Sequence, residues 1–154
     1  MNTDKFRFYH SIQVRYADTD AQGHVFFSNY LTYFDESHAA YLRAVGVPWP
    51  RLEEMGLDSY HVSAHCDFKG SAGFEDILHV HGRMTRIGNS SYTMEFAIYK
   101  DDSDQLIASG ALTAVIVARE TRQPTRVPDE IREAVADYEG RSWEQPEIEI
   151  DTEI

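Results

Sequence analysis

Two carboxylates and a histidine lie close together in one short polar stretch near the N-terminus, Asp18-Thr19-Asp20-Ala21-Gln22-Gly23-His24. Short polar side chains and glycine favour turns over regular structure, so we expect a loop here. A carboxylate in such a loop could act as a nucleophile or as a general base, and it could equally close a turn with the backbone. The histidine could donate a proton or position its neighbours. This stretch is the first candidate for a chemical site.

Regular elements are predicted on both sides of this loop. Residues 8–16 alternate apolar and polar side chains, which is the pattern of a half-buried strand. Residues 29–45 contain no Gly or Pro and repeat apolar side chains at helical spacing. Ser28 or Asn29 can cap the start of this helix, and Gly46 can end it. The helix would be roughly 25 Å long, and its first N–H groups would point back towards the loop.

Four more strands and a short helix are predicted in the rest of the chain. The strands span residues 59–69, 75–87, 90–100 and 105–119. Turn residues separate the last three strands, so these should form an antiparallel meander. Residues 46–57 show no regular pattern, and residues 128–139 have helical spacing. The order of elements predicts an α+β domain in which one antiparallel sheet covers one long helix.

The composition limits the class of protein. The 154 residues fit one domain, and the 42% hydrophobic and 26% charged residues are ordinary for a folded chain. The formal net charge of -12 argues against nucleic acid as a partner. Residues 129–154 contribute -8 of this charge through ten acidic and two basic side chains. We therefore expect a domain over residues 1–140 and an acidic tail over residues 141–154.

Cysteine content and hydropathy bear on the compartment. Cys66 is the single cysteine and can form no internal disulfide, which favours a reducing cytoplasm. The N-terminal residues do not have the pattern of a signal peptide, and nowhere do 18 apolar residues follow one another. We therefore expect a cytoplasmic protein with no membrane partner.

Two pairs of histidines invite a metal hypothesis. His79 and His81 alternate on one predicted strand, and His61 and His65 lie four residues apart on another, so each pair could share a face. The sequence places no carboxylate or cysteine convincingly with either pair, so we expect no metal site. Cys66 lies on an apolar strand, where a lone cysteine is ordinarily an unreactive packing residue.

Three runs of the sequence carry a resemblance to a known family. Residues 14–31 contain Y-x-D-T-D-x-x-G-H-V-x-x-x-x-Y-L, residues 87–92 contain I-G-x-S-S, and residues 126–131 contain R-x-P-x-x-I. Together with the order of elements, they resemble the hotdog-fold acyl-CoA thioesterases of the 4-hydroxybenzoyl-CoA thioesterase type. The resemblance implies about five antiparallel strands wrapped around one central helix. Ser71-Ala72-Gly73 replaces the family's common Pro-Ala-Arg, and Asn89 replaces a frequent basic residue.

The resemblance implies an acyl-CoA thioesterase that needs no metal or organic cofactor. By the motif match, Asp20 is the catalytic aspartate, acting as nucleophile or general base on an acyl-CoA substrate. The backbone N–H of Phe27 would polarise the thioester carbonyl, as an oxyanion-hole donor does. Asp18, Gly23 and His24 would support the loop around Asp20.

The resemblance also implies that the substrate pocket lies between two subunits beside the long helix, in a homodimer or homotetramer. The candidate substrate-binding residues are Tyr33, Asp35, Phe68, Arg86, Ser90, Ser91 and Arg126. Arginines of this set are possible clamps for the phosphates of coenzyme A. Two other functions stay open: a non-catalytic acyl-CoA-binding hotdog module, and a hotdog hydratase or dehydratase.

Overall fold

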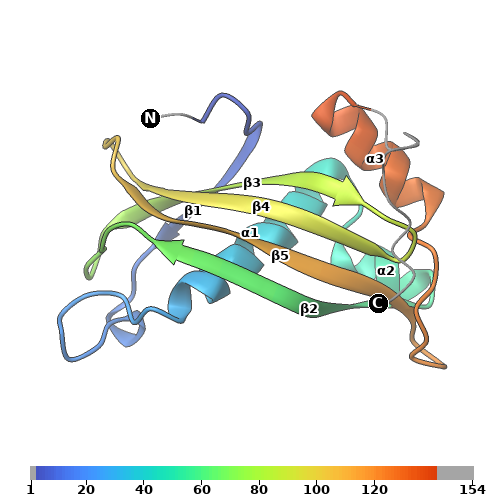
Figure 1. Ribbon diagram of the computed structural model, residues 1–154, viewed down its shortest axis with the longest axis horizontal. Helices are drawn as coiled ribbons and strands as arrows, with labels where there is room; N and C mark the ends of the chain where they lie inside the picture. Colours follow the sequence, from blue (N-terminus) through green and yellow to red (C-terminus); the bar gives the residue numbers. More distant parts are fainter. Residues whose placement is uncertain (1–2, 142–154) are drawn as a thin grey trace.

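One long helix lies across a face of a five-stranded antiparallel sheet in the computed structural model, which describes residues 3–141 (Figure 1). The strands are β1 (Phe8–Gln13), β2 (Leu57–Phe68), β3 (Ile77–Ile87), β4 (Ser91–Lys100) and β5 (Leu106–Ala118), in the order β1-β3-β4-β5-β2 across the sheet. The helices are α1 (Asn29–Val45), α2 (Trp49–Glu54) and α3 (Asp129–Glu139), and a 3-10 turn spans Tyr16–Asp18. The predicted α+β architecture is confirmed.

Helix α1 begins and ends where the sequence predicted. Its bounds coincide with residues 29–45, and Gly46 follows with a φ of 95°. This left-handed conformation ends the helix and is free of a Cβ clash only in glycine. Phe34 and Tyr41 of α1 are fully buried, whereas Asp35 is exposed. The helix therefore presents one apolar side to the sheet.

Aromatic side chains fill the space between α1 and the sheet. Phe34 of α1 stacks on Phe96 of β4, with ring centroids 4.8 Å apart and 11° between the ring planes. Helix α3 closes one end of this core, where its Ile131 is buried. The Tyr41 hydroxyl of α1 donates a hydrogen bond to the Glu139 carboxylate of α3 at 2.6 Å. These contacts fix the orientation of α1 against the sheet.

Two segments differ from the predictions. The first strand, predicted over residues 8–16, ends at Gln13, because the chain then enters the 3-10 turn of Tyr16–Asp18. Tyr16, the last residue of the predicted strand, is 76% exposed. Residues 46–57 were expected to be irregular, but they contain α2. A helix of six residues is too short to produce a recognisable helical period in the sequence.

Strand β2 is an edge of the sheet and is exposed over much of its length. Among the described strands it pairs only with β5, while β3, β4 and β5 form the predicted meander. A bulge at Val62 shifts the register between His61 and Ser63, which reverses the facing of the residues that follow. His61 lies towards α1, so His65 lies towards the opposite face. The prediction that these two histidines share a face is wrong.

The C-terminal part of the domain agrees with the prediction of a short last helix. Helix α3 follows Pro128, and Gly140 ends it with a φ of 69°. The predicted acidic tail over residues 141–154 lies outside the described residues, apart from Arg141. Within residues 3–141, no helix has the length and apolar character needed to cross a membrane.

The tight approach of β5 to β2 gives a testable prediction at Gly110. A Cβ added at Gly110 would lie 2.0 Å from the backbone oxygen of His65 and 2.9 Å from the ring of Phe34. Gly110→Ala should therefore lower the free energy of unfolding by about 1–3 kcal/mol or more, measured by urea denaturation. Gly73→Ala is the control, because a Cβ there meets no atom closer than 3.8 Å. Equal midpoints for the two variants would contradict this packing.

Candidate functional site

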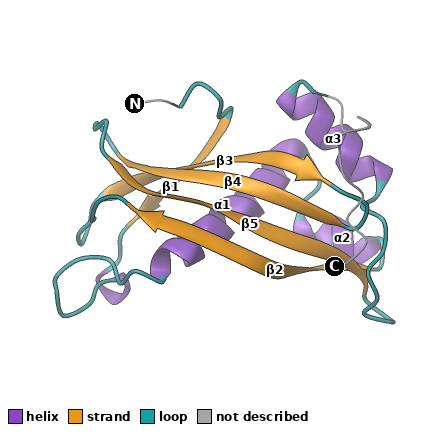
Figure 2. Cartoon of the chain, viewed as in Figure 1, coloured by secondary structure: helices purple, strands orange, loops and turns teal. Residues whose placement is uncertain are grey.

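The loop between β1 and α1 is attached to the segment that precedes β3. The backbone N–H of Val25 donates to the Ala72 carbonyl at 2.8 Å, and Thr19 and Val25 form an isolated antiparallel bridge. Within the loop, the N–H of Phe26 donates to the Asp18 carbonyl at 2.9 Å. Figure 2 shows this loop at the end of the sheet towards which β2 points. The polar stretch is therefore an ordered loop, held by backbone hydrogen bonds within the loop and to the segment before β3.

The side chain of Asp18 is buried in the loop and is 6% exposed. It accepts hydrogen bonds from the Arg15 guanidinium at 2.8 Å, the Arg15 backbone N–H at 3.0 Å and the Tyr33 hydroxyl at 2.9 Å. Burial alone would raise the pKa of Asp18, but these hydrogen bonds and the charge of Arg15 outweigh it and hold the pKa below its usual range. The side-chain amide of Asn29 donates to the Asp18 carbonyl at 2.9 Å. Asp18 therefore connects the loop to α1.

Asp20 lies half-buried in a tight turn at the tip of the loop. Its N–H donates to the His24 carbonyl at 3.0 Å, and its carbonyl accepts from the N–H of Gly23 at 2.9 Å. Gly23 has a φ of 83°, which the turn requires and which disfavours other residues. Oδ1 of Asp20 accepts the N–H of Gln22 at 2.9 Å, and no described residue donates to Oδ2. One carboxylate oxygen is held by the turn, and the other is available.

The start of α1 leaves a backbone donor beside this loop. The N–H groups of Asn29, Tyr30 and Leu31 donate to carbonyls three residues earlier, at 2.8, 3.3 and 3.1 Å. Within the described chain, no group accepts a hydrogen bond from the N–H of Phe27. A free N–H at a helix N-terminus is suited to an oxygen that carries negative charge.

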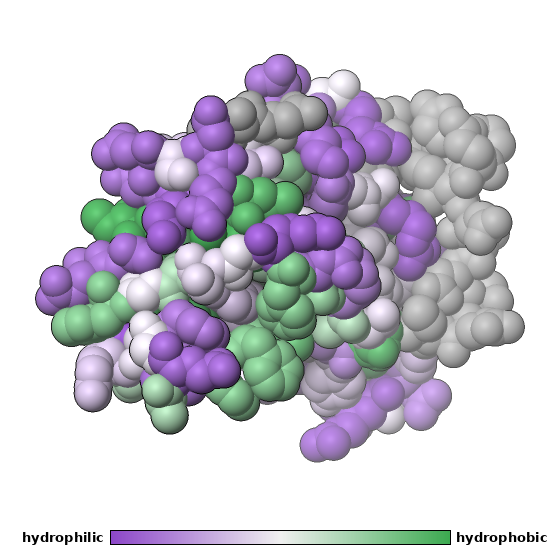
Figure 3. Space-filling model, turned by 60° about the vertical axis from the view of Figure 1, so that its left-hand side comes forward, coloured by the Kyte–Doolittle hydropathy of each residue, from purple (hydrophilic) through white to green (hydrophobic). Residues whose placement is uncertain are grey.

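The side chain of Phe27 lies among other aromatic rings. The ring of Phe27 lies 4.9 Å from that of Phe26 and 5.9 Å from that of Phe68, measured between centroids. Phe68, at the end of β2, also lies 5.9 Å from Tyr30. Phe27 is 59% exposed and Phe68 is 49% exposed. Figure 3, in which this end of the molecule comes forward, shows hydrophobic side chains gathered among hydrophilic ones.

The structure brings some predicted site residues together. Asp18, Asp20, Gly23 and His24 share the loop, and Nδ1 of His24 lies 3.1 Å from the Val25 carbonyl oxygen. Phe27 and Phe68 lie beside this loop as described above. Tyr33, predicted to bind substrate, is 2% exposed and directs its hydroxyl at Asp18. Tyr33 therefore supports the loop through its hydrogen bond to Asp18.

Four of the other predicted substrate-binding residues lie at the far end of the sheet, near the β3–β4 turn and α3 (Figure 1): Arg86, Ser90, Ser91 and Arg126. Asp35 lies in α1, beside His61 of β2. Arg86 donates to the Ser91 hydroxyl at 2.9 Å, and both Ser90 and Ser91 are buried. Arg126 is bonded to Asp129 at 3.0 Å. Within one chain, these groups do not meet the Asp20 loop.

A cluster that the sequence analysis missed lies between α1 and β2. Oδ1 of Asp35 lies 2.8 Å from Nε2 of His61 and 3.8 Å from Nδ1 of His38. The three residues border a cavity of about 330 Å³ that Leu42 and Trp49 also line. The spacing of Asp35 and His38, three residues apart in a helix, is a sequence signal that the two side chains lie on one face. The sequence pattern paired His61 with His65. The bulge in β2 that separates their faces has no clear sequence signature.

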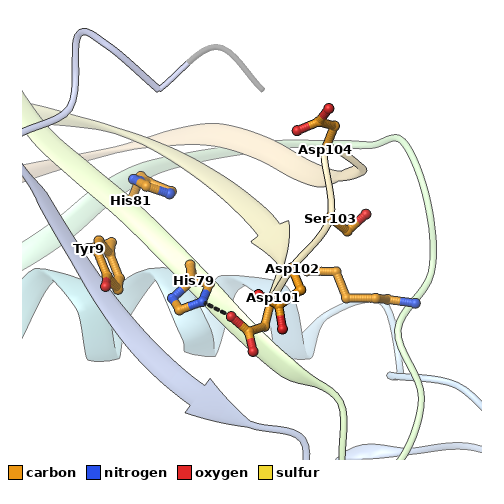
Figure 4. Close-up of a pocket in the computed structure, with 8 residues that line it drawn as sticks. Tyr9, His79, His81, Asp101, Asp102, Ser103 and Asp104 are labelled. Carbon is orange, nitrogen blue, oxygen red and sulfur yellow. Dashed lines mark hydrogen bonds and ion pairs between the residues drawn. The ribbon is translucent and has the colours of Figure 1, made fainter.

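A second cavity, of about 440 Å³, lies beside β1, β3 and the β4–β5 turn (Figure 4). Both ring nitrogens of His79 are hydrogen-bonded: Nε2 to the Asp101 carboxylate at 2.7 Å and Nδ1 to the Ser11 hydroxyl at 3.1 Å. Burial, and then the neighbouring His79, lowers the pKa of His81. No predicted site residue lines this cavity. Within the lining, His79 and Asp101 form an ion pair.

Known proteins share both the sequence pattern and the fold of this chain. A family model described as "Thioesterase-like superfamily" matches residues 14–135. A relative from Aquifex aeolicus is 32% identical over 90 residues, which cover 58% of this chain and 70% of that protein. A 1,4-dihydroxy-2-naphthoyl-CoA hydrolase from Synechococcus is 28% identical over 122 residues, covering 75% and 80% of the two chains.

Solved structures agree with the sequence relatives. The crystal structure of a 1,4-dihydroxy-2-naphthoyl-CoA thioesterase from Synechocystis matches with a TM-score of 0.78 and 26% identity. The match covers 84% of this chain and 96% of that one. The fold implied by the resemblance, a hotdog fold, is confirmed.

The Asp18 network predicts a pH-dependent contribution to stability. Because the folded-state pKa of Asp18 is lowered, its contribution is present above the unfolded-state pKa of about 3.9 and is lost as the pH falls through the folded-state value. Asp18→Asn should lower the free energy of unfolding at pH 7 by about 1–3 kcal/mol. The difference from the wild type should shrink below about pH 4.

Urea denaturation between pH 3 and pH 7 measures this effect. Asp137→Asn, an exposed aspartate of α3, is the control and should change stability little. If Asp18→Asn behaves like this control at pH 7, the buried network does not hold the loop.

Proposed function

We propose, from the premise that this chain belongs to the thioesterase-like superfamily and is a thioester hydrolase, that it cleaves acyl-CoA thioesters at the Asp20 loop. The proposal rests on one observation above others. A carboxylate with an available oxygen lies in the same short loop as a helix N-terminus whose Phe27 N–H has no acceptor among the described residues. A hydrolase of activated carbonyls needs both groups.

The reaction follows from these two groups. The thioester carbonyl oxygen accepts a hydrogen bond from the Phe27 N–H, which stabilises the negative charge that develops as the carbonyl is attacked. The Asp20 carboxylate either attacks the carbonyl carbon, giving an anhydride that water then opens, or removes a proton from the attacking water. The C–S bond breaks and the CoA thiolate leaves. The products are the free acid and CoA.

An acyl group with a ring system suits the surroundings of the donor. Phe26, Phe27 and Phe68 offer ring faces and edges beside the loop, and aromatic pairs favour such stacked and edge contacts. The Synechococcus and Synechocystis proteins named above act on a dihydroxynaphthoyl thioester. We therefore place aromatic acyl-CoA thioesters ahead of linear ones as substrates.

A homodimer paired along β2 would complete the binding site. The long outer edge of β2 carries backbone groups that no described strand pairs, and such an edge favours pairing with another strand. Antiparallel pairing of two copies would bring the β3–β4 end of one copy alongside the Asp20 end of the other. Arg86, Ser90, Ser91 and Arg126 of the second copy would then lie on the side from which CoA approaches.

The catalytic role of Asp20 is tested by Asp20→Asn. This substitution removes the nucleophile or base while it keeps the Oδ1 acceptor of the turn, so kcat should fall by about 10²–10⁴-fold. Release of free thiol from aromatic and linear acyl-CoA thioesters measures the rate, and Asp137→Asn is the control. Unchanged hydrolysis by Asp20→Asn would sink the proposal.

Tight binding of acyl-CoA by the wild type without turnover would favour the non-catalytic module, and hydration of a crotonyl-type thioester would favour the hydratase.

The pairing of β2 is tested at Val62, which is 49% exposed at the bulge. Val62→Glu introduces a charge on this edge, so it should shift the protein from dimer to monomer and reduce turnover. Light scattering after size exclusion measures the mass. Ile77→Glu, at an exposed apolar position of β3, is the matched control. A wild-type monomer with full activity would contradict the proposed dimer.

A further inference from the structure

We propose that Asp35, His38 and His61 form a binding site for a divalent transition-metal ion such as Zn²⁺, separate from the Asp20 loop. The site is formed by two residues of α1 and one of β2. It does not depend on the proposed thioester chemistry. It revises the expectation from the sequence that the chain has no metal site.

The distances between the three ligand atoms suit a single ion. Oδ1 of Asp35 lies 2.8 Å from Nε2 of His61 and 3.8 Å from Nδ1 of His38, and all three atoms lie within 4.8 Å of one another. Ligands bound tetrahedrally at roughly 2.0–2.1 Å from Zn²⁺ are about 3.3 Å apart. Small side-chain rotations would therefore bring the three atoms to coordination geometry.

The orientation of His38 is fixed by a hydrogen bond at its other ring nitrogen. Its side chain is 8% exposed, and its Nε2 lies 2.8 Å from the hydroxyl of the buried Tyr92. The Tyr92 hydroxyl lies 3.0 Å from the hydroxyl of Ser59. Because Nε2 is occupied by this chain of hydroxyls, Nδ1 is the ring nitrogen that faces Asp35. Histidine ligands of metal ions typically have such a partner at the other nitrogen.

The charge and the donor types define the class of ion. Asp35 contributes a carboxylate oxygen, and His61 and His38 contribute imidazole nitrogens at 2.8 and 3.8 Å from that oxygen. One carboxylate and two imidazoles favour Zn²⁺, Co²⁺, Ni²⁺ or Cu²⁺ over Mg²⁺ and Ca²⁺, which prefer oxygen ligands.

The site is open on one side. The Asp35 side chain is 61% exposed and that of His61 is 40% exposed, and both border the cavity of about 330 Å³. An ion can enter from solvent, and a water or an added ligand can occupy its remaining position. Pairing along β2 would use backbone groups at the strand edge, whereas His61 contributes a side chain on the α1 side. The dimer and the metal site therefore do not compete.

The cavity in Figure 4 provides a comparison within the same chain. His79 also contacts a carboxylate, that of Asp101 at 2.7 Å, and a hydroxyl, that of Ser11, lies at its other ring nitrogen, but among the described residues no third ligand is grouped with this pair. In the part of the chain that the structure describes, Asp35, His38 and His61 are the one set of three such ligands close enough to share an ion. His79 is therefore a matched control for histidine loss.

Metal titration of the full chain tests the proposal. After removal of metals with a chelator, calorimetry with Zn²⁺ should give one site per chain with a Kd below about 10 µM (an affinity near 7 kcal/mol). Co²⁺ should give the visible absorption bands of a four-coordinate ion. His61→Ala and Asp35→Asn should each weaken Zn²⁺ binding at least tenfold, while His79→Ala should leave it unchanged.

Two results would overturn the proposal. One is the absence of saturable Zn²⁺ binding by the wild type. The other is binding that persists in His61→Ala and Asp35→Asn, or that falls equally in His79→Ala. Circular dichroism of each variant establishes that the fold is retained. Thiol release from acyl-CoA, measured separately, distinguishes failure of the metal site from failure of the proposed hydrolysis.

Discussion

The buried Asp18 carboxylate is the interaction on which the candidate site depends. It receives hydrogen bonds from Arg15, two residues after the end of β1, and from Tyr33 in α1, so one anion connects both ends of the loop. A buried charge is stable only when such partners satisfy it. Since the loop and the start of α1 share this anchor, the turn around Asp20 and the N–H of Phe27 are fixed relative to each other.

The sheet provides the second constraint, because α1 can keep its place only if the strands pack closely over it. The stack of Phe34 on Phe96 lies beside Gly110, where β5 leaves no room for a Cβ. This close packing brings β2 near the helix. Phe68 then lies beside Phe27, and His61 lies beside Asp35. Two different clusters of functional groups thus arise along one interface, between α1 and β2.

Much of the fold could be predicted from the sequence because its signals are local. The helix over residues 29–45 has a regular apolar period and a glycine stop, and the meander has clear turn residues. Helix α2 was missed because it is too short to show a period. The contacts of the Asp20 loop with Ala72 and the burial of Tyr33 depend on the tertiary packing, which local patterns do not encode.

The site could be predicted only in part, for a similar reason. The motif in residues 14–31 identified the loop, because the groups that form it are adjacent in sequence. The cluster of Asp35, His38 and His61 was missed because it combines a helix with a strand, and a single bulge at Val62 decides which histidine faces it. The predicted CoA-binding residues lie at the other end of the sheet, which a sequence motif cannot reveal.

Hydrolysis at the Asp20 loop requires that the thioester carbonyl bind between the Asp20 carboxylate and the N–H of Phe27. A crystal structure with a non-hydrolysable acyl-CoA analogue, in which a methylene group replaces the sulfur, tests this placement. We expect the carbonyl oxygen of the analogue to lie within hydrogen-bonding distance of the Phe27 nitrogen, with Oδ2 of Asp20 facing the carbonyl carbon or a water beside it. A carbonyl bound elsewhere, for example in the cavity beside His79, with Asp20 far from it, would show that the two groups do not form the site.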